Sequence, residues 1–426
     1  MRPWLAIADG MNASTTDTIL DAGIALLAEA GPRAASVRGI ADRAGVRPAA
    51  LQHHFPTKAL LTRAIYERAS ARHVAASAEA LAQCAKLGTL KALMPEAAIS
   101  LLGIWRGGLS RETAVLLHML AQAARDAAYA DIARNWVEQT IARIGQGLGC
   151  GPDHAEFIVE LLTALTLTSA PSAFGLASDV LNREFIPFAL GDRRTGPDSG
   201  DGYHLFRARA AATRLPRPAL DSAAGMVASA ALDAGIAIMA ESGAEALSYR
   251  TIAARAGVAS SSILYNFPTR AALVMAIYEE IHRRFATPTI GLNLPQGRPS
   301  EQIIGLFTPM IVDEKAGAAP LVLASCELFL AAWWEPELAD SAWAMRLARG
   351  ARAEDGHEAS AEKSLTTHFL SVWTIGLSLA QLSRHPADLH HQIGTRLATG
   401  MAIAGLDSGE RRSPPRPAPS TPPAKK

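Results

Sequence analysis

The sequence contains an internal repeat, and this repeat restricts the possible folds more than any other feature. Residues 19–67 align with residues 231–279 at a constant offset of 212 positions without a gap, and about 27 of the 49 aligned residues are identical. The identities include Asp21 with Asp233 and the Phe-Pro-Thr segment that begins at Phe55, so shared alanine alone does not explain them. A segment that recurs at a fixed spacing indicates a duplicated structural unit. We therefore expect two similar domains in one chain.

The composition favours helices throughout the chain. Its 426 residues suffice for roughly two to four domains, and apolar residues make up 49% of them, enough to fill several cores. Alanine and leucine are abundant, whereas aromatic and β-branched residues are sparse outside short patches. Unbranched side chains lose less rotamer freedom in a helix than branched ones do. The sequence therefore predicts an all-α protein.

The cysteines and the hydropathy pattern indicate a cytoplasmic protein. Cys84, Cys150 and Cys326 lie far apart, and no C-x-x-C spacing indicates a zinc site or a redox pair. The first residues lack a sustained apolar segment, and no uninterrupted apolar run reaches about 18 residues. We therefore expect a reducing, cytoplasmic setting, no membrane contact, no bound metal and no cofactor.

Each copy of the repeat contains the signals of a helix-turn-helix. In the first copy, Gly31 follows an amphipathic segment and offers a helix stop. Ser36 is suited to cap a short helix, and Gly45 can take the positive φ of a tight turn. Pro48 suits the first position of a second short helix, with Leu51 on its buried side. Two short helices joined by a glycine-containing turn form a helix-turn-helix.

At these residues the sequence resembles a known family. The segments IADRAGVRPAALQHHFPTKALL (residues 40–61) and IAARAGVASSSILYNFPTRAAL (residues 252–273) are similar to the helix-turn-helix of TetR transcriptional regulators. The resemblance implies two tandem TetR-like units, each with a three-helix DNA-binding head and a helical effector and dimerisation bundle. It also implies a cytoplasmic repressor that binds an operator on double-stranded DNA and responds to a small-molecule effector.

The resemblance further implies which residues contact DNA, because the second short helix of such a head enters the major groove. The groove-facing residues would be Arg47, Pro48, Ala49, Ala50, Gln52 and His53 in the first copy, and Ala259, Ser260, Ser261, Ser262, Leu264 and Tyr265 in the second. Phosphate contacts would come from Ser36, Arg38, His54 and Lys58 in the first copy, and from Ser248, Arg250, Asn266 and Arg270 in the second. Ser36 and Ser248 could instead serve only as helix caps, and Arg38 could be a solvated surface charge.

The two heads differ in charge and in their expected contact residues. Residues 14–72 hold eight Lys or Arg against five Asp or Glu, whereas residues 226–285 hold five against five. The family commonly has a tyrosine where this chain has Gln52 and Leu264, and leucine cannot donate a hydrogen bond. We therefore expect the first head to bind DNA and the second to bind weakly or not at all. If the units form an internal pseudo-dimer the operator would be asymmetric, and a further homodimer is the alternative.

Helix-like segments with apolar stripes follow each head and predict the effector bundles. The expected domains are residues 14–68 (first head), 69–190 (first effector and dimerisation domain), 191–222 (linker), 223–285 (second head), 286–407 (second effector and dimerisation domain) and 408–426 (disordered Pro-rich tail). Residues 156–170 and 364–382 carry almost no charge, which makes them candidates for the dimer interface.

Large side chains on the alanine-rich helices are candidates for an effector pocket. They are Trp105, His118, Met119 and Trp136 in the first half, and Trp333, Trp334, Trp343, His368 and Trp373 in the second. For each of them, a place in the core is the more frequent role. Because pockets between bundle helices are mostly apolar, the expected effector is hydrophobic.

Two other functions compete with this interpretation. The sequence lacks the G-x-S-x-G, H-E-x-x-H, phosphate-loop and dinucleotide-binding motifs, so we do not expect an enzyme. The second alternative is an interaction or scaffold protein in which one or both heads have lost DNA binding. Leu264 and the neutral second head favour this alternative, and the basic first head argues against it.

Overall fold

The computed structural model describes residues 14–86, 90–169, 175–192, 222–286, 299–313, 317–318, 320–349 and 361–406, and these residues are almost entirely helical. The strands within these ranges are β1 (Val312–Asp313) and β2 (Gly317–Ala318), which pair antiparallel. The all-α prediction is therefore confirmed. Most of the expected linker (residues 193–221) and the whole expected tail (408–426) lie outside the described residues.

The first unit, residues 14–192, starts with a head and continues into a bundle. The head consists of α1 (Thr15–Ala34), α2 (Val37–Ala44) and α3 (Pro48–His54). The bundle consists of α4 (Lys58–Ala85), η2 (Lys91–Leu93), α5 (Met94–Arg106), α6 (Ser110–Arg125), η3 (Ala127–Tyr129), α7 (Ala130–Leu148), α8 (Pro152–Leu167) and α9 (Gly175–Ala189). Helix α4 packs on both α1 and α7, so the boundary expected at residue 68 falls inside one continuous helix.

The second unit, residues 222–406, repeats this order. Its head consists of α11 (Ser222–Ser242), η4 (Ala244–Ala246), α12 (Tyr249–Ala256) and α13 (Ser260–Asn266). Its body consists of α14 (Arg270–Ala286), α15 (Pro299–Ile311), α16 (Pro320–Ala331), α17 (Pro336–Ala348), α18 (Ala361–Leu382) and α19 (Leu389–Ile403). Moving α8 and α9 by 212 positions places them inside or largely over α18 and α19. The structural repeat therefore extends beyond the heads to the end of each body.

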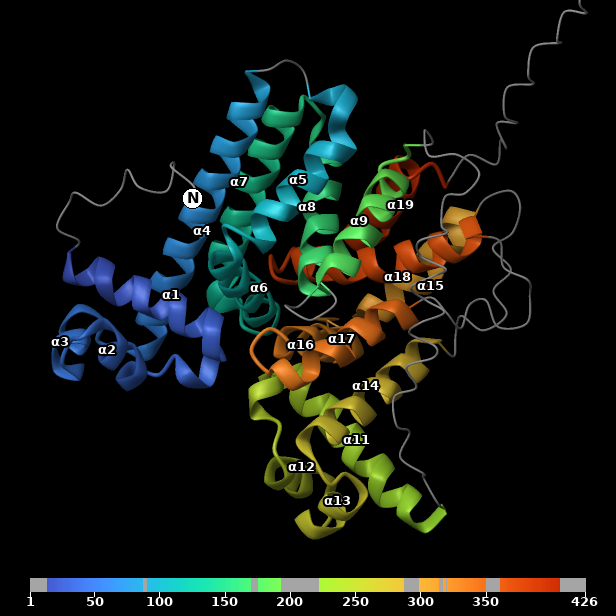
Figure 1. Ribbon diagram of the computed structural model, residues 1–426. Coiled ribbons are helices and arrows are strands. Elements are labelled where there is room, and N and C mark those ends of the chain that lie inside the picture. The colour runs from blue at the N-terminus through green and yellow to red at the C-terminus, as the bar shows by residue number, and fades with distance from the viewer. Residues whose placement is uncertain are drawn as a thin grey trace, which may run out of the picture.

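The two units meet along their corresponding last helices. Helix α8 packs along α18 and also touches α19, while α9 contacts α18 (Figure 1). Gly376 in α18 allows the close approach, because a Cβ at this position would overlap the carbonyl oxygen of Glu160 in α8. The two candidate interface segments, 156–170 and 364–382, thus lie against each other.

Charged groups at this contact are buried and unequally distributed. Glu160, from the first unit, is fully buried and accepts hydrogen bonds from Arg396 Nε (3.0 Å), Trp373 Nε1 (3.1 Å) and Gln381 Nε2 (3.2 Å) of the second unit. Burial raises the pKa of Glu160, and the Arg396 guanidinium opposes this rise. The first unit therefore supplies the carboxylate and the second unit the donors.

A second buried polar group crosses the contact at another place. Arg346 of the second unit is fully buried and donates to Ser169 Oγ (2.6 Å), Ser178 Oγ (3.0 Å) and Asn182 Oδ1 (2.6 Å) of the first unit. Burial lowers the pKa of Arg346 to about 9. The three acceptors are replaced by Gln381, His390 and Gly394 at the repeat-related positions, so the contact between the units is not symmetric in its chemistry.

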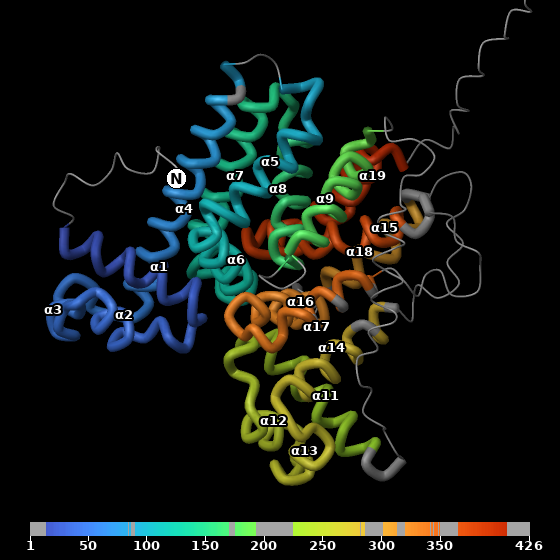
Figure 2. The backbone as a smooth tube through the Cα atoms, in the orientation of Figure 1, coloured from blue at the N-terminus to red at the C-terminus, as the bar shows by residue number. Residues whose placement is uncertain are grey.

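In the view of Figure 2 the first head lies to the left of the α8–α18 contact and the second head lies below it. The first head also touches the second unit directly. Gly31 kinks α1 with φ 75°, and a Cβ there would lie 2.8 Å from the Trp334 ring of the second unit. Arg33 donates to the backbone oxygen of Glu245 in the second head. The relative position of the two heads is therefore set partly by contacts between them.

One helix is long and apolar enough to pass a length and composition test for membrane spanning. It is α11, whose window Gly225–Ser242 has a mean hydropathy of 1.2, and half of the window is buried inside the protein. Asp233 in this window pairs with Arg284, and Glu241 pairs with Arg255. These features are typical of a helix in the core of a head domain.

Candidate nucleic-acid interface

Local signals build the helix-turn-helix of the first head. Ser36 accepts a hydrogen bond from the backbone N–H of Gly39 (3.1 Å) and begins α2 as its N-cap. Gly45 ends α2 at φ 68°, a conformation that glycine adopts without the steric cost borne by other residues. Pro48 opens α3, and the fully buried Leu51 anchors this helix on the head. These features confirm the helix-turn-helix expected in the first copy.

The second head repeats the same construction. Ser248 caps α12 in a reciprocal capping box with Thr251, and Gly257 ends the helix at φ 67°. Ile263 takes the buried place in α13 that Leu51 takes in α3. Glu241 and Arg255 form an ion pair at 2.6 Å, and the repeat-related Glu29 and Arg43 pair at 2.7 Å. The repeat therefore preserves the fold of the head in detail.

The first recognition helix presents its predicted groove face to solvent. Arg47, Pro48, Ala49, Ala50, Gln52 and His53 are all exposed. Among these, the Arg47 guanidinium and the Gln52 amide are the groups able to form paired hydrogen bonds with base edges. That these residues contact DNA stays a prediction.

The second recognition helix presents a different face. Ser260 and Ser261 are exposed, Ser262 is half-buried, and Leu264 and Tyr265 are 49% and 84% exposed. Ala259, at the N-cap of α13, is exposed and makes no side-chain cap. This surface offers hydroxyl groups and a phenol, and its exposed leucine is apolar.

The predicted phosphate contacts in the first head remain accessible, apart from Ser36, which is half-buried as a cap. The Arg38 side chain is 88% exposed, and its guanidinium lies 3.8 Å from the Asp42 carboxylate. Lys58 is exposed at the start of α4, and His54 Nδ1 lies 3.2 Å from Thr16 Oγ1. The side chains of Arg38 and Lys58 are therefore both accessible to a DNA phosphate.

The corresponding residues of the second head are mostly engaged within the protein. Arg270 holds Glu335 through two hydrogen bonds (Nε–Oε2 2.9 Å, Nη2–Oε1 2.7 Å) and donates to the Leu247 carbonyl. Asn266 donates to the Ser262 carbonyl (2.7 Å), while Ser248 serves as a cap. Arg250 is the predicted phosphate contact in this head that stays exposed. The imbalance in basic charge is thus larger in the structure than in the residue counts.

A helix-turn-helix that occurs twice, with both recognition helices exposed, defines a DNA-binding regulator of the helix-turn-helix class. The model for bacterial regulatory proteins of the tetR family matches residues 19–65 and 231–277. The two heads are therefore DNA-binding domains of the TetR type, and the chain carries two of them in tandem. Regulators of this family bind DNA and control transcription, and they are generally not enzymes. No curated protein is significantly similar to the chain.

The candidate pocket residues of the first body do not gather at one site. Trp105 and Trp136 flank the buried His73, with ring centroids 4.7 and 5.6 Å from the imidazole centroid. The cavity among them is only about 10 Å³, close to the space that one water molecule needs. His73 Nε2 and the buried hydroxyls of Thr163 and Thr166, which also line this cavity, have no hydrogen-bond partner among the described residues.

His118 lies apart from this aromatic cluster. It is buried on α6, and its Nδ1 lies 2.8 Å from the Tyr66 hydroxyl. Together with Tyr66 it lines a larger cavity of about 310 Å³ between the first head and its body. Met119, its neighbour in the sequence, is fully buried in the core.

The candidates in the second body lie mainly at the contact between the units. Trp333 donates from Nε1 to the Leu167 carbonyl of the first unit (3.3 Å). His368 meets Phe185 of the first unit edge-to-face, with ring centroids 5.4 Å apart. Trp373 stacks on Phe369 and donates to Glu160. Their role in holding an effector stays a prediction.

Proposed function

We propose that the chain is a transcriptional repressor that binds operator DNA as an internal pseudo-dimer, with the first head as the principal DNA-binding surface. The observation that carries this proposal is the exposed face of α3, where Arg47, Gln52 and His53 lie beside the accessible Arg38 and Lys58. Phosphate contacts from Lys and Arg position such a head, and base contacts make it specific.

The arrangement of the units supports the pseudo-dimer. In a dimeric regulator two recognition helices approach one duplex from the same side. Here α8 and α18 join two such heads within one chain, and Arg33 of the first head also contacts Glu245 of the second. Because α3 and α13 expose different side chains, the proposed operator has two different half-sites. In size-exclusion chromatography the free full-length protein should therefore have the mass of one chain, and the complex with DNA should contain one chain per duplex.

The test is selection of bound duplexes from a random pool, followed by affinity measurements over a range of salt concentrations. We expect an enriched asymmetric site whose affinity falls as salt rises, because phosphate contacts release counterions. Arg38→Ala should weaken binding to all sequences and reduce the salt slope by about one unit. Gln52→Ala should change the preference at one base pair. If no sequence is enriched and salt has no effect, the proposal fails.

A second candidate function rests on the second head. Arg255 and Arg270 are paired with carboxylates, and Leu264 and Tyr265 are exposed, so this head could bind another protein instead of DNA. Ser261→Ala separates the two possibilities. A changed preference in one half of the selected site supports DNA contact by α13, whereas an unchanged site supports the protein-binding alternative.

We further propose a hydrophobic effector for the aromatic cluster of the first body. Trp105 and Trp136 supply an apolar wall, and the unpartnered hydroxyls of Thr163 and Thr166 could orient a ligand there. The present cavity is small, so an effector has to displace side chains to enter. Tryptophan fluorescence during titration with apolar compounds tests this, with Trp105→Phe as the variant that should alter the response.

A further inference from the structure

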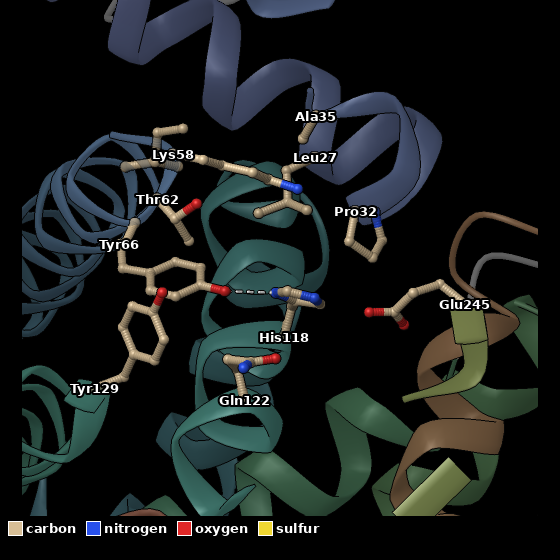
Figure 3. Close-up of a pocket in the computed structure, with 12 residues that line it drawn as sticks. Leu27, Pro32, Ala35, Lys58, Thr62, Tyr66, His118, Gln122, Tyr129 and Glu245 are labelled. Atoms are coloured by element: carbon tan, nitrogen blue, oxygen red, sulfur yellow. Dashed lines mark hydrogen bonds between the residues drawn. The ribbon is translucent and has the colours of Figure 1, made fainter. Parts of the chain in front are cut away.

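One cavity lies where the first head, the first body and the second head meet. It measures about 310 Å³ and is lined by α1, α4, α6 and η3 of the first unit and by Glu245 in η4 of the second (Figure 3). Leu27 and Pro32 form an apolar wall, and Tyr66 and Tyr129 form an aromatic one. The volume is at the lower end of the range for small-molecule sites. This cavity is separate from the aromatic cluster around Trp105.

A buried hydrogen-bond donor faces the cavity. Burial lowers the pKa of His118 to about 4, so its imidazole is neutral near pH 7, and burial raises the pKa of Tyr66 well above its usual value. We assign the Tyr66 hydroxyl as the donor to His118 Nδ1, and in this tautomer the imidazole proton is on Nε2. Nε2 has no partner among the described residues and points away from Tyr66 toward the space beside Pro32 and Glu245 (Figure 3). A buried donor without a partner is unfavourable, and a hydrogen-bond acceptor on a ligand would remove that cost.

Two opposite charges reach the same cavity from different walls. The Lys58 ammonium comes from α4 of the first unit and the Glu245 carboxylate from η4 of the second (Figure 3). No described residue lies within ion-pair distance of either group, but Glu245 is not isolated: burial and the Glu327 carboxylate raise its pKa, and the Arg125 and Arg33 guanidinium groups oppose this rise. A ligand with a single charge would match one of these groups and be repelled by the other. A molecule that carries both charges matches both.

We propose that this cavity binds a small zwitterion that has one ammonium and one carboxylate group joined by an apolar part. The ligand carboxylate lies toward Lys58 and the Nε2–H of His118, and its ammonium lies toward Glu245. The apolar part packs on Leu27 and Pro32. The amide of Gln122, which also lines the cavity, can bond to either charged end.

The position of this site couples it to both heads. Glu327 in α16 accepts from the backbone N–H of Ala244 (3.0 Å), beside Glu245, and also pairs with Arg125 at the end of α6. Helix α6 carries His118, so a ligand in the cavity contacts the helix that holds the second head in place. Lys58 is also a predicted phosphate contact, so the ligand carboxylate competes with DNA for it. This coupling rests on the proposed DNA binding, whereas the ligand site does not.

Matched sets of small molecules test the ligand class on the full-length protein without DNA. The probes are leucine, phenylalanine, γ-aminobutyrate and ε-aminocaproate, each beside the amine that lacks its carboxylate and the acid that lacks its amino group. We expect at least one zwitterion to raise Tm and to bind, by titration calorimetry, about tenfold or more tightly than its two matched analogues. The proposal is overturned if none binds at up to about 50 mM, or if a singly charged analogue binds as well.

Substitutions place the binding in this cavity. Glu245→Gln keeps the size of the side chain and should weaken zwitterion binding about tenfold or more, and Lys58→Met should do the same. Glu79→Gln, which changes an exposed glutamate on α4 away from the cavity, should leave binding unchanged. Equal binding by Glu245→Gln and the parent protein, with both folded to the same Tm, overturns the site.

DNA binding is then measured separately, with and without the zwitterion. If the ligand binds but no operator is found, the proposed repressor function fails and the site stands. If the protein binds an operator but no zwitterion, the proposed ligand site fails and the proposed repressor function stands.

Discussion

Replacing Arg396 tests how strongly the buried carboxylate at the unit contact depends on its partner. Arg396→Met keeps an unbranched stem of similar length and removes the guanidinium that lies 3.0 Å from Glu160. Breaking a buried ion pair on one side costs about 3–5 kcal/mol. Trp373 and Gln381 still donate to Glu160 in the variant, so we expect the lower end, about 3 kcal/mol.

The expected loss translates into a measurable change in Tm. For 426 residues that unfold together the unfolding entropy is about 0.9 kcal/mol/K, so a loss of about 3 kcal/mol should lower the Tm of the variant by about 3 °C. If the units unfold separately, the melting temperature of the step that breaks the α8–α18 contact should fall by more than this. The control is Arg111→Met, whose partner Glu29 lies at the surface, and it should shift Tm by less than about 1 °C.

The pH dependence follows from the state of Glu160. Burial already raises its pKa above the ordinary value of 4.5, and loss of Arg396 raises it further. A carboxyl with a raised folded-state pKa stabilises the fold below its unfolded pKa and loses this contribution as pH rises through the folded value. The deficit of Arg396→Met should therefore be larger near pH 8 than near pH 5.5, and Glu160→Gln in the same chain should restore part of the stability.

Calorimetry and urea unfolding at both pH values decide the matter. The reasoning is wrong if Arg396→Met melts within about 1 °C of the parent at pH 8, or if its deficit is independent of pH. Failure of Glu160→Gln to relieve the deficit would mean that Arg396 contributes through packing and not through its charge.

Three further outcomes are expected. Gly376→Ala should lower Tm by several degrees, because its Cβ overlaps the backbone of α8, whereas Gly305→Ala in open space on α15 should raise stability by about 0.5–1 kcal/mol in calorimetry. Gly45→Ala should cost about 1–2 kcal/mol in urea unfolding from its positive φ alone, since nothing lies within 4 Å of the added carbon. Tyr66→Phe should cost about 1–3 kcal/mol by thermal melting, because it leaves His118 Nδ1 without a donor; an unchanged Tm would rule out that hydrogen bond.

Local signals in the sequence were sufficient to predict the heads and most helices. Ser36, Gly45 and Pro48 act over one or two turns, so their effect on the chain can be predicted without knowledge of distant residues. Helix α8 is one of the apolar helix-like segments expected after the first head, and a proline at its first turn and an apolar stripe define it locally. The helix stop predicted at Gly31 is confirmed, because Gly31 takes a non-helical conformation (φ 75°, ψ 179°) and the turn that follows it to Ala34 is set off by a kink.

Features that depend on distant contacts were not predictable. Arg270 was expected at a phosphate, but Glu335, which binds it, lies 65 residues further on and carries no signal in its own segment. Glu245 was not a candidate for any site, because only the packing of the second head on the first brings it to the cavity at His118. The repeat indicated two similar units, while the specific contacts between them depend on residues that differ between the copies.

The contact between α8 and α18 has a consequence for how the protein responds to its own abundance. Two separate subunits associate in proportion to the square of their concentration and come apart on dilution, whereas two halves of one chain meet at an effective concentration set by their tether. In a homodimer an interface residue has to fit a copy of its own surface. Here Glu160 of one half meets Arg396 of the other, so the two halves can carry different residues at the contact. Occupancy of a DNA site by this chain should therefore vary with the first power of its concentration, even when a cell holds only a few copies.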